Sequence, residues 1–264
     1  MAGKAAIVLG NSHLSSVVLQ LKDRPGEVYG GDESLQYFVF DTVRMGANFQ
    51  FSVDSGGGNY RINPEILGLV NSRVPEGLER IYISMFGGNA HNALTLLEHP
   101  RPFDFILPER PNLPVEPGRE LVTSSYINAF LNKMAAVAVL NMAALRHSVS
   151  EAIYHFESPP PVGDNRFIMD NLEGYFIEQS NNPQIAPIYL RYKLWRMHSI
   201  LISGFCAQAG IEFLPSPAES LDAAGFMKSE HARDSTHAGA SYGGLILKDL
   251  ERRLGSKYGG WQWL

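Results

Sequence analysis

The sequence predicts an α/β protein, a three-layer α/β/α sandwich with a central parallel sheet of five strands. Short apolar runs alternate with longer segments of helical period, which is typical of a parallel sheet with helices on both faces. The run at residues 80–86 is apolar enough to be buried on both faces, as parallel strands are. With 264 residues, 45% of them hydrophobic and 19% charged, the chain suits one globular domain. No internal repeat or linker divides residues 1–264, so we expect a single domain.

Apolar, β-branched and aromatic residues mark the five expected strands. They lie at residues 5–10, 35–41, 80–86, 152–156 and 211–214. Segments of helical period mark the expected helices, at residues 13–22, 64–70, 119–147, 189–209 and 242–254. In the first of these helices Leu14, Val17 and Leu21 share one face, and Pro64 begins the second.

Three further segments lack a clear period. Residues 49–53 are expected to take part in a hairpin. The region 158–187 has turns, aromatic residues and little periodicity, which is typical of an insertion that lines a pocket, and Tyr175 and Phe176 are where we expect an acyl or sugar group. The aromatic segment 258–263 is expected to pack on the domain or on a second subunit, which leaves a homo-oligomer open.

The amino-acid composition limits which binding partners and which cellular compartment are expected. The net charge is −5 and no run of Lys or Arg occurs, which argues against nucleic acid as a partner. The single cysteine, Cys206, excludes an intrachain disulfide framework and lies in an apolar helical stretch, where we expect it to fill the core. No run approaches the roughly 18 apolar residues that a membrane span needs, and the first apolar segment is too short for a signal peptide. A cytoplasmic protein without a membrane span is expected.

Polar loops follow three of the expected strands, at residues 10–13, 87–89 and 234–237. Because the carboxyl ends of parallel strands meet at one edge of a sheet, these loops are expected to converge. Acyl transfer by a serine hydroxyl requires a base, an acceptor that orients the base, and donors for the oxyanion of the tetrahedral intermediate. The three loops together contain residues of each of these kinds.

In this order, the loop residues resemble the SGNH (GDSL-type) hydrolase family, over nearly the whole chain. The family's first block, usually Gly-Asp-Ser, is similar to Gly-Asn-Ser at residues 10–12, which implies that Ser12 is the nucleophile. Its third block, Gly-x-Asn, is similar to Gly-Gly-Asn at residues 87–89, which implies that Asn89 donates its side-chain amide to the oxyanion. The Ser12 backbone N–H is implied as a second donor.

The family's fifth block, Asp-x-x-His, matches the residues from Asp234 to His237. The resemblance implies that His237 is the base and Asp234 its partner. It also implies a flavodoxin-like fold and hydrolysis of a small-molecule carboxylic ester through an acyl-enzyme, such as an acetyl or other short acyl ester of a carbohydrate or small alcohol. No metal or organic cofactor is implied.

Two positions depart from the family's pattern. Asn11 stands where the first block usually has an aspartate, which keeps the capacity to form a turn but loses a charge. The second-block glycine, which donates a backbone N–H to the oxyanion, has no decisive match. Gly46, just beyond the second expected strand, is the first choice, and the loop at residues 56–58 is the second.

Residues beside these blocks are candidates for substrate contacts, namely Asn11, His13, Gly88 and His91. Both histidines are expected near the mouth of the pocket, with a solvated surface histidine as the alternative. No His-Glu-x-x-His arrangement occurs, so a metal site is not expected. The glycine loops lack the patterns that bind phosphate groups, so a nucleotide cofactor is not expected either.

Each of the four central residues also has a purely structural interpretation. Ser12 fits a helix cap, Asn89 a turn, and Asp234 a cap of the last helix, with His237 at its entrance. One site explains all four together. Two other functions stay open: an O-acyltransferase that uses the same Ser-His-Asp residues, and a catalytically inactive relative that binds a ligand.

Overall fold

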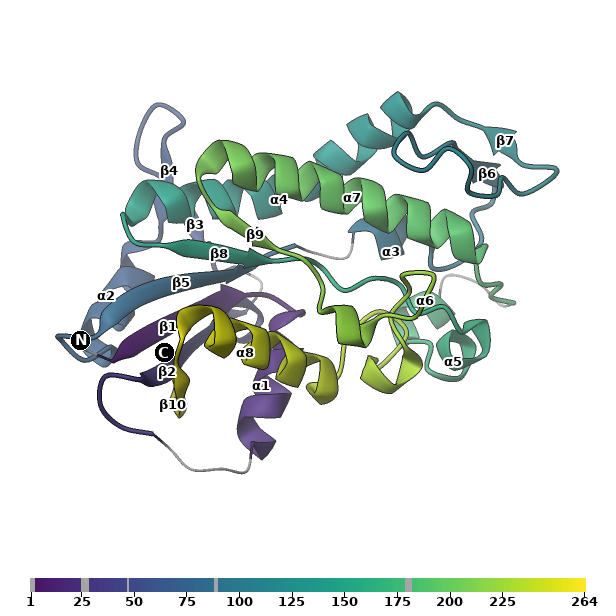
Figure 1. Cartoon of the computed structure of the whole chain (residues 1–264). Coiled ribbons are helices and arrows are strands. Elements are labelled where there is room, and N and C mark those ends of the chain that lie inside the picture. Colours follow the sequence, from purple (N-terminus) through teal and green to yellow (C-terminus); the bar gives the residue numbers. More distant parts are fainter. Residues whose placement is uncertain (1–2, 25–28, 47, 88–89, 179–181) are drawn as a thin grey trace.

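Six parallel strands form the central sheet of the computed structural model (Figure 1). From one edge of the sheet to the other they are β10 (Lys257–Trp263), β2 (Ser34–Asp41), β1 (Lys4–Gly10), β5 (Glu79–Met85), β8 (Ile153–Phe156) and β9 (Glu212–Leu214). Every neighbouring pair is parallel. The structure describes residues 3–24, 29–46, 48–87, 90–178 and 182–264.

The strand order β2-β1-β5-β8-β9 is that of a flavodoxin-like sheet, because within this sheet it reads 2-1-3-4-5 along the chain. The predicted fold class, a three-layer α/β/α arrangement around a parallel sheet, is therefore confirmed. All five expected strands occur within one or two residues of their predicted bounds.

The predicted number of strands was wrong, because residues 257–263 form the sixth strand β10 at the edge beside β2. The two adjacent glycines at positions 259 and 260 interrupt the alternation of apolar and polar residues by which a strand is predicted from the sequence. The structure accommodates them with a shift of register between Tyr258 and Trp261. The aromatic segment thus packs on the domain by extending its sheet.

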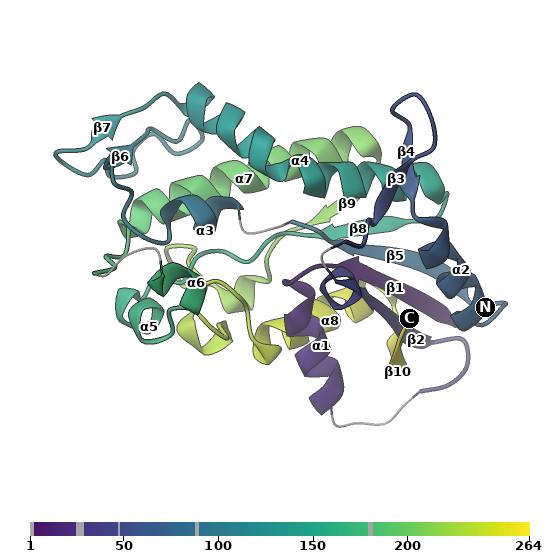
Figure 2. The same cartoon turned by 180° about the vertical axis from the view of Figure 1, so that it is seen from behind.

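Helices cover both faces of the sheet (Figures 1 and 2). One face carries α1 (Leu14–Asp23) and α8 (Ala240–Leu254), and the other carries α2 (Pro64–Arg73), α4 (Ser124–Ser148) and α7 (Ile188–Ala209). Side chains of β1 alternate between the two layers: Val8 belongs to the core beneath α1 and α8, whereas Ile7 and Leu9 belong to the core beneath α2, α4 and α7.

Helices α1 and α8 approach each other closely at Gly243. A Cβ atom at this position would lie 2.1 Å from the carbonyl oxygen of Ser16. Since that neighbour is backbone and not a flexible side chain, only glycine allows this contact. The two helices begin just after the first and the last of the three polar loops, so the contact fixes both loops relative to each other.

The long helix α4 begins later than predicted. We expected it from residue 119, but Glu120–Leu121 (β7) pairs with Phe103–Asp104 (β6), and the Thr123 hydroxyl accepts a hydrogen bond from the Tyr126 amide at 3.3 Å. This cap makes Ser124 the first helical residue.

The remaining elements are short. They are β3 (Ser52–Asp54) and β4 (Tyr60–Ile62), which form the expected hairpin, α3 (Ala90–Thr95), α5 (Asn165–Asp170), α6 (Gly174–Ile177), and the 3₁₀ turns Thr42–Met45, Ala218–Ser220 and Ser229–His231. The insertion at residues 158–187 thus contains two short helices that its sequence pattern does not reveal. Within it, Tyr175 is 65% exposed, whereas Phe176 is buried in the core.

Helix α4 is long and apolar enough, by its length and composition, to cross a membrane, and it is the one described helix of which this is true. This differs from the expectation that no such segment occurs. The helix packs against α7 and the β3–β4 hairpin, and 28% of its most apolar 18-residue window is buried.

Candidate active site

The clearest candidate for catalytic chemistry is a histidine and carboxylate pair in the loop before α8. The Nδ1 atom of His237 lies 3.0 Å from Oδ1 and 3.2 Å from Oδ2 of Asp234. The backbone amides of Thr236 and His237 donate to the same Oδ1 at 3.0 and 2.8 Å. Because the carboxylate binds the turn that carries its own partner, the Asp-x-x-His spacing holds the imidazole in place.

The environment of Asp234 keeps its carboxylate ionised. Burial acts to raise the pKa of Asp234, but hydrogen bonds from His237, the Thr236 amide and Arg233 outweigh it and hold this pKa well below its usual range. A carboxylate that accepts the Nδ1 proton of an imidazole leaves Nε2 as the proton acceptor. An imidazole in this orientation is able to accept a proton at Nε2.

Glu173 is a second carboxylate beside the histidine, and the sequence analysis did not identify it. Its Oε2 accepts a hydrogen bond from the Thr236 hydroxyl at 2.7 Å, and its Oε1 lies 3.5 Å from Nδ1 of His237. Glu173, Asp234 and His237 each offer a ligand atom within 4.8 Å of the others, so they are the described residues that could hold a metal ion. The direct hydrogen bond between His237 and Asp234 already accounts for their proximity.

Ser12 lies in the turn between β1 and α1 with its side chain exposed. Gly10 makes this turn sterically feasible, because a Cβ atom there would lie 2.9 Å from the Cβ of Met85 on the neighbouring strand. The residue that caps α1 is His13, without a capping side chain, and within the described parts of the chain no hydrogen bond engages the Ser12 hydroxyl. The interpretation of Ser12 as a helix cap is therefore wrong.

Two contacts hold the last loop against the turn that carries Ser12. The ring centroid of His13 lies 5.8 Å from that of His237. One turn further along α1, the Ser15 hydroxyl accepts a hydrogen bond from Arg233 at 2.9 Å. The first and last polar loops therefore meet, as their positions after β1 and β9 predict. No hydrogen bond joins Ser12 to His237 among the described residues.

The alternative role of Asp234 as a helix cap is also wrong. Helix α8 begins at Ala240 after Gly239, and no side chain caps it. The Asp234 carboxylate instead binds amides within its own loop.

Asn11, the departure from the usual first block, has a physical explanation. Its side-chain oxygen Oδ1 is buried, and no described residue donates a hydrogen bond to it. An aspartate with the same side-chain conformation would bury a charged oxygen without a partner, which costs considerably more than burying a neutral amide oxygen. Its role as a substrate contact stays a prediction.

The expectation that His13 and His91 lie at the mouth of a pocket was wrong, because both are buried, with exposures of 5% and 1%. Helix α3 packs against α7, and this places the ring of His91 5.5 Å from that of His198. Burial lowers the pKa of His198 to about 4 and that of His155 to about 3. A cluster of uncharged histidines thus lies beneath the candidate site, and a contact of His13 or His91 with substrate stays a prediction.

The expected donors to an oxyanion lie only partly within the described residues. Gly88 and Asn89 lie outside the described residues. The amide of Gly46 donates to the carbonyl of Val43 at 3.3 Å, so in this structure it is engaged in the 3₁₀ turn. The second choice, residues 56–58, is the tip of the β3–β4 hairpin, whose Ile62 amide binds Ser148 at the end of α4, just before β8 begins. The hairpin thus packs on α4.

The fold and this site define a flavodoxin-like α/β protein with a histidine and carboxylate pair beside an exposed serine, at the carboxyl edge of the sheet. No protein-family model matches the sequence. No curated protein matches it either.

Solved structures similar to this chain include lipases and esterases. One is a GDSL-like lipase from Bacteroides thetaiotaomicron, with 9% identity over 96% of this chain and 88% of that chain, at a TM-score of 0.41. Another is an extracellular lipase from Streptomyces rimosus, with 13% identity over 94% of this chain and 100% of that chain, at a TM-score of 0.44. A carbohydrate acetylesterase from Sinorhizobium meliloti has 11% identity over 96% of this chain and 98% of that chain, at a TM-score of 0.40.

Proposed function

We propose that this chain is a serine esterase of the SGNH type that hydrolyses a carboxylic ester through an acyl-enzyme. The observation that carries the proposal is the hydrogen bond between His237 Nδ1 and Asp234, in a loop held against the turn with the exposed Ser12. The order of the blocks along the sequence supports it independently. An acetyl or other short acyl ester of a carbohydrate or small alcohol is the proposed substrate.

In the proposed reaction, Nε2 of His237 takes the proton of the Ser12 hydroxyl while its oxygen attacks the ester carbonyl carbon. The carbonyl oxygen becomes an oxyanion, which the Asn89 amide and backbone N–H groups of Ser12 and of a second-block glycine, with Gly46 as the first choice, stabilise. The intermediate then collapses. The alcohol leaves with the proton from His237, and Ser12 keeps the acyl group as an ester.

Water then hydrolyses the acyl-enzyme. In this second half of the reaction water is the nucleophile and the Ser12 oxygen is the leaving group. His237 takes a proton from water, the hydroxide attacks the acyl carbon, and the Ser12 oxygen leaves with that proton. Throughout, Asp234 stabilises the transient imidazolium through Nδ1. Every step uses groups of this chain, the ester and water, so the proposal includes no metal or organic cofactor.

The test compares Ser12→Ala with Ser72→Ala, a variant of an exposed serine on α2. Wild-type protein is assayed on p-nitrophenyl acetate and treated with a fluorophosphonate, and the labelled residue is located by mass spectrometry. We expect labelling at Ser12 and a loss of turnover of about a thousandfold or more in Ser12→Ala. Ser72→Ala should match the wild type.

Retained turnover in Ser12→Ala would refute the role of Ser12. A folded wild-type protein that neither cleaves the ester nor reacts with the fluorophosphonate would instead support the ligand-binding alternative. Adding an acceptor alcohol distinguishes hydrolysis from O-acyl transfer, because a transferase forms the new ester at the expense of the free acid.

A further inference from the structure

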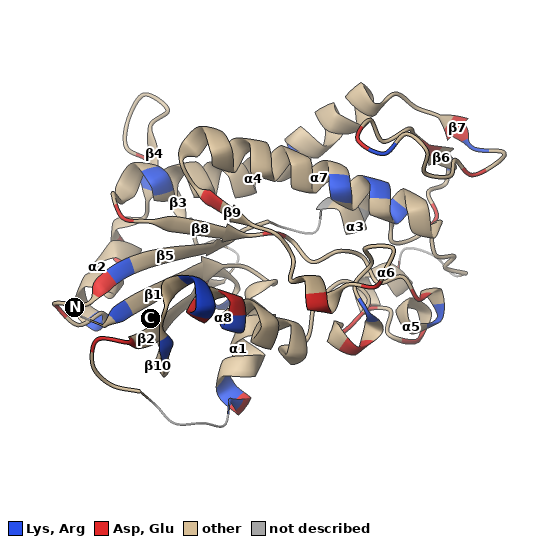
Figure 3. Ribbon diagram, in the orientation of Figure 1, with Lys and Arg blue, Asp and Glu red and all other residues tan. Residues whose placement is uncertain are grey.

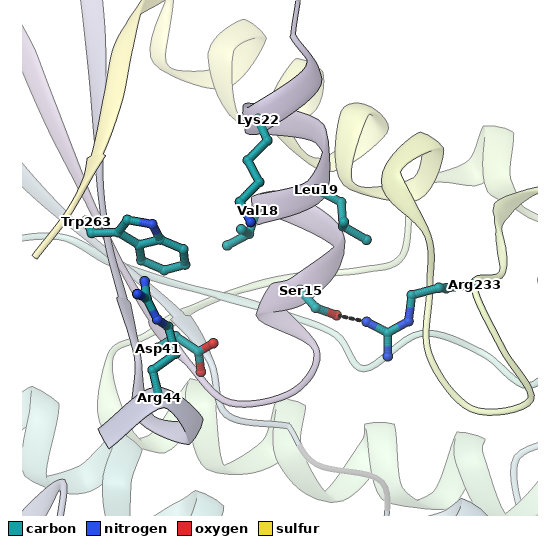
Figure 4. A pocket seen from close by; sticks show the side chains of 8 residues that line it. All are labelled: Ser15, Val18, Leu19, Lys22, Asp41, Arg44, Arg233 and Trp263. Carbon is teal, nitrogen blue, oxygen red and sulfur yellow. Dashed lines mark hydrogen bonds between the residues drawn. The ribbon is translucent and has the colours of Figure 1, made fainter. Parts of the chain in front are cut away.

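A cavity of about 360 Å³ lies beside the candidate site, between α1, the end of β2 and the end of β10 (Figure 4). Its walls are formed by Ser15, Val18, Leu19, Lys22, Asp41, Arg44, Arg233 and Trp263. Neither the sequence motifs nor the proposed reaction assigns this cavity a role.

One end of the cavity adjoins the proposed catalytic residues. Asp41 is paired in the sheet with Gly10, two residues before Ser12. Ser15 lies one helical turn after Ser12, and it accepts a hydrogen bond from Arg233, the residue that precedes Asp234. A group in this cavity is therefore close enough to belong to the same small molecule as the reacting ester.

The cavity continues from there along α1. Ser15 and Lys22 are seven positions apart, which corresponds to about 10 Å of helix. Figure 4 shows the Lys22 side chain running back along α1 toward Val18, so its ammonium group faces the same space as Trp263. This length fits a benzene ring or a sugar ring with one substituent.

The polar walls carry an excess of positive charge. Three of the lining side chains are cationic, whereas Asp41 alone is acidic. Arg233 is already paired with Asp234 at 2.9 Å. The guanidinium of Arg44 stacks 4.0 Å from the centroid of a Trp263 ring, and among the described residues no carboxylate oxygen lies within 4.0 Å of the cationic groups of Arg44 or Lys22.

This local charge contrasts with the chain as a whole, whose net charge is −5. Figure 3 shows acidic and basic residues next to one another on α8. In the cavity, Arg44 and Lys22, neither of which forms an ion pair with another described residue, instead face one space with an indole, and the Asp41 carboxylate interacts with Arg44 at longer range. Val18 and Leu19 add an apolar wall on the side of α1.

We propose that this cavity binds an anionic group of the ester substrate, a carboxylate or a phosphate, with Arg44 and Lys22 as its ligands. The carbon frame between the anion and the ester contacts Val18, Leu19 and the edge of Trp263. A planar guanidinium held by stacking loses little freedom when it binds an oxyanion, which favours Arg44 as the principal contact. The inference builds on the proposed esterase function and names its substrate class.

The experiment measures kcat/KM for matched pairs of neutral and anionic esters. Phenyl acetate is compared with 4-acetoxybenzoate and 4-acetoxyphenyl phosphate, which carry the anion on the alcohol side, and p-nitrophenyl butyrate with mono-p-nitrophenyl succinate, which carries it on the acyl side. We expect at least one anionic ester to exceed its neutral partner by about tenfold, and this ratio to fall with added salt. The pair with the largest ratio shows which anion is bound and whether it lies on the alcohol side or the acyl side of the ester.

Arg44→Gln and Lys22→Gln are each expected to lower that ratio by about tenfold, the loss of one charge-assisted hydrogen bond. The matched control is Arg73→Gln, an exposed arginine at the end of α2 on the other face of the sheet, which should leave the ratio unchanged. A ratio near one in the wild type for all pairs would overturn the inference while leaving the esterase proposal in place.

Binding distinguishes failure of this inference from failure of the esterase proposal. If no ester is cleaved, titration calorimetry with 4-hydroxyphenyl phosphate and 4-hydroxybenzoate is done on the wild type and on Arg44→Gln. Binding that Arg44→Gln weakens about tenfold supports the anion site without catalysis. The absence of binding in the wild type overturns it.

Discussion

The imidazole Nδ1 of His237 and its own backbone amide both donate to one oxygen of Asp234, at 3.0 and 2.8 Å. One carboxylate therefore fixes both the ring and the turn that carries it. We expect Asp234→Asn to lower kcat by roughly 10²- to 10⁴-fold, because an amide favours the wrong imidazole tautomer and does not stabilise the imidazolium. Steady-state kinetics on p-nitrophenyl acetate measure the change. Asp54→Asn, in the exposed β3–β4 hairpin, is the control, and equal rates in both variants would contradict the assignment.

Glu173 places a second negative charge 3.5 Å from His237 Nδ1. Removing this charge in Glu173→Gln weakens the stabilisation of the imidazolium that forms during turnover, so kcat/KM on p-nitrophenyl acetate should fall by about threefold. Gln retains an acceptor for the Thr236 hydroxyl, which separates the charge effect from loss of the hydrogen bond. Glu65→Gln, at the exposed start of α2, should match the wild type. An unchanged kcat/KM in Glu173→Gln would show that its charge is screened from His237.

The buried histidines predict a stability that falls on acidification. The pKa of His198 is about 4 and that of His155 about 3 in the folded chain, below the value near 6.5 of an exposed histidine. The unfolded chain therefore binds more protons below about pH 6.5, and stability that is complete above this pH is lost as the pH falls toward 4. Between pH 7.5 and 5, each of these two histidines should remove about 2 kcal/mol from the free energy of unfolding.

Urea unfolding at pH 7.5, 6 and 5 tests this. In His198→Phe the slope against pH should be shallower than in the wild type, because one titrating group is missing. His147→Phe replaces an exposed histidine at the end of α4 and should keep the wild-type slope. If both variants keep the same slope, His198 is not uncharged and buried in solution.

The contact of α8 with α1 predicts opposite outcomes for two adjacent glycines. In Gly243→Ala the new Cβ would lie 2.1 Å from the Ser16 carbonyl oxygen, so the helices must separate, at a cost of about 1–3 kcal/mol. In Gly244→Ala the new Cβ meets only the flexible Gln20 side chain, at 3.1 Å, and the gain in helix propensity of up to about 1 kcal/mol should prevail. Thermal unfolding of the pair measures the difference, and equal stabilities would contradict the close contact.

Strands and helices with a strong local period were predictable from the sequence. The five predicted strands are runs such as residues 80–86, whose side chains alone favour burial on both faces. Strand β10 was not predictable in this way, because residues 259 and 260 are glycines and its partner β2 lies over 200 positions earlier in the chain. The start of α4 likewise depends on the pairing of β7 with β6, which no local pattern reveals.

The same distinction holds for the site. The Asp-x-x-His spacing is local, so the pair of Asp234 and His237 could be anticipated, and the structure brings it together. Glu173 comes from an irregular insertion, where a single glutamate has no recognisable pattern. The burial of His91 depends on the packing of α3 on α7, a tertiary contact between segments about a hundred residues apart.

The close contact of α1 and α8 at Gly243 also bears on whether two fragments of a cleaved chain could together form an active site. The proposed nucleophile and its base reside near opposite ends of the polypeptide, which are joined by this helix pair and by the pairing of β10 with β2, while the exposed hairpin tip at residues 56–58 belongs to a hairpin that packs on α4. A proteolytic nick at this tip would give two fragments, of which one holds Ser12 and the other His237. Neither fragment contains a complete site, and activity would require their noncovalent complementation through the α1–α8 interface and the strand pairs β1–β5 and β2–β10.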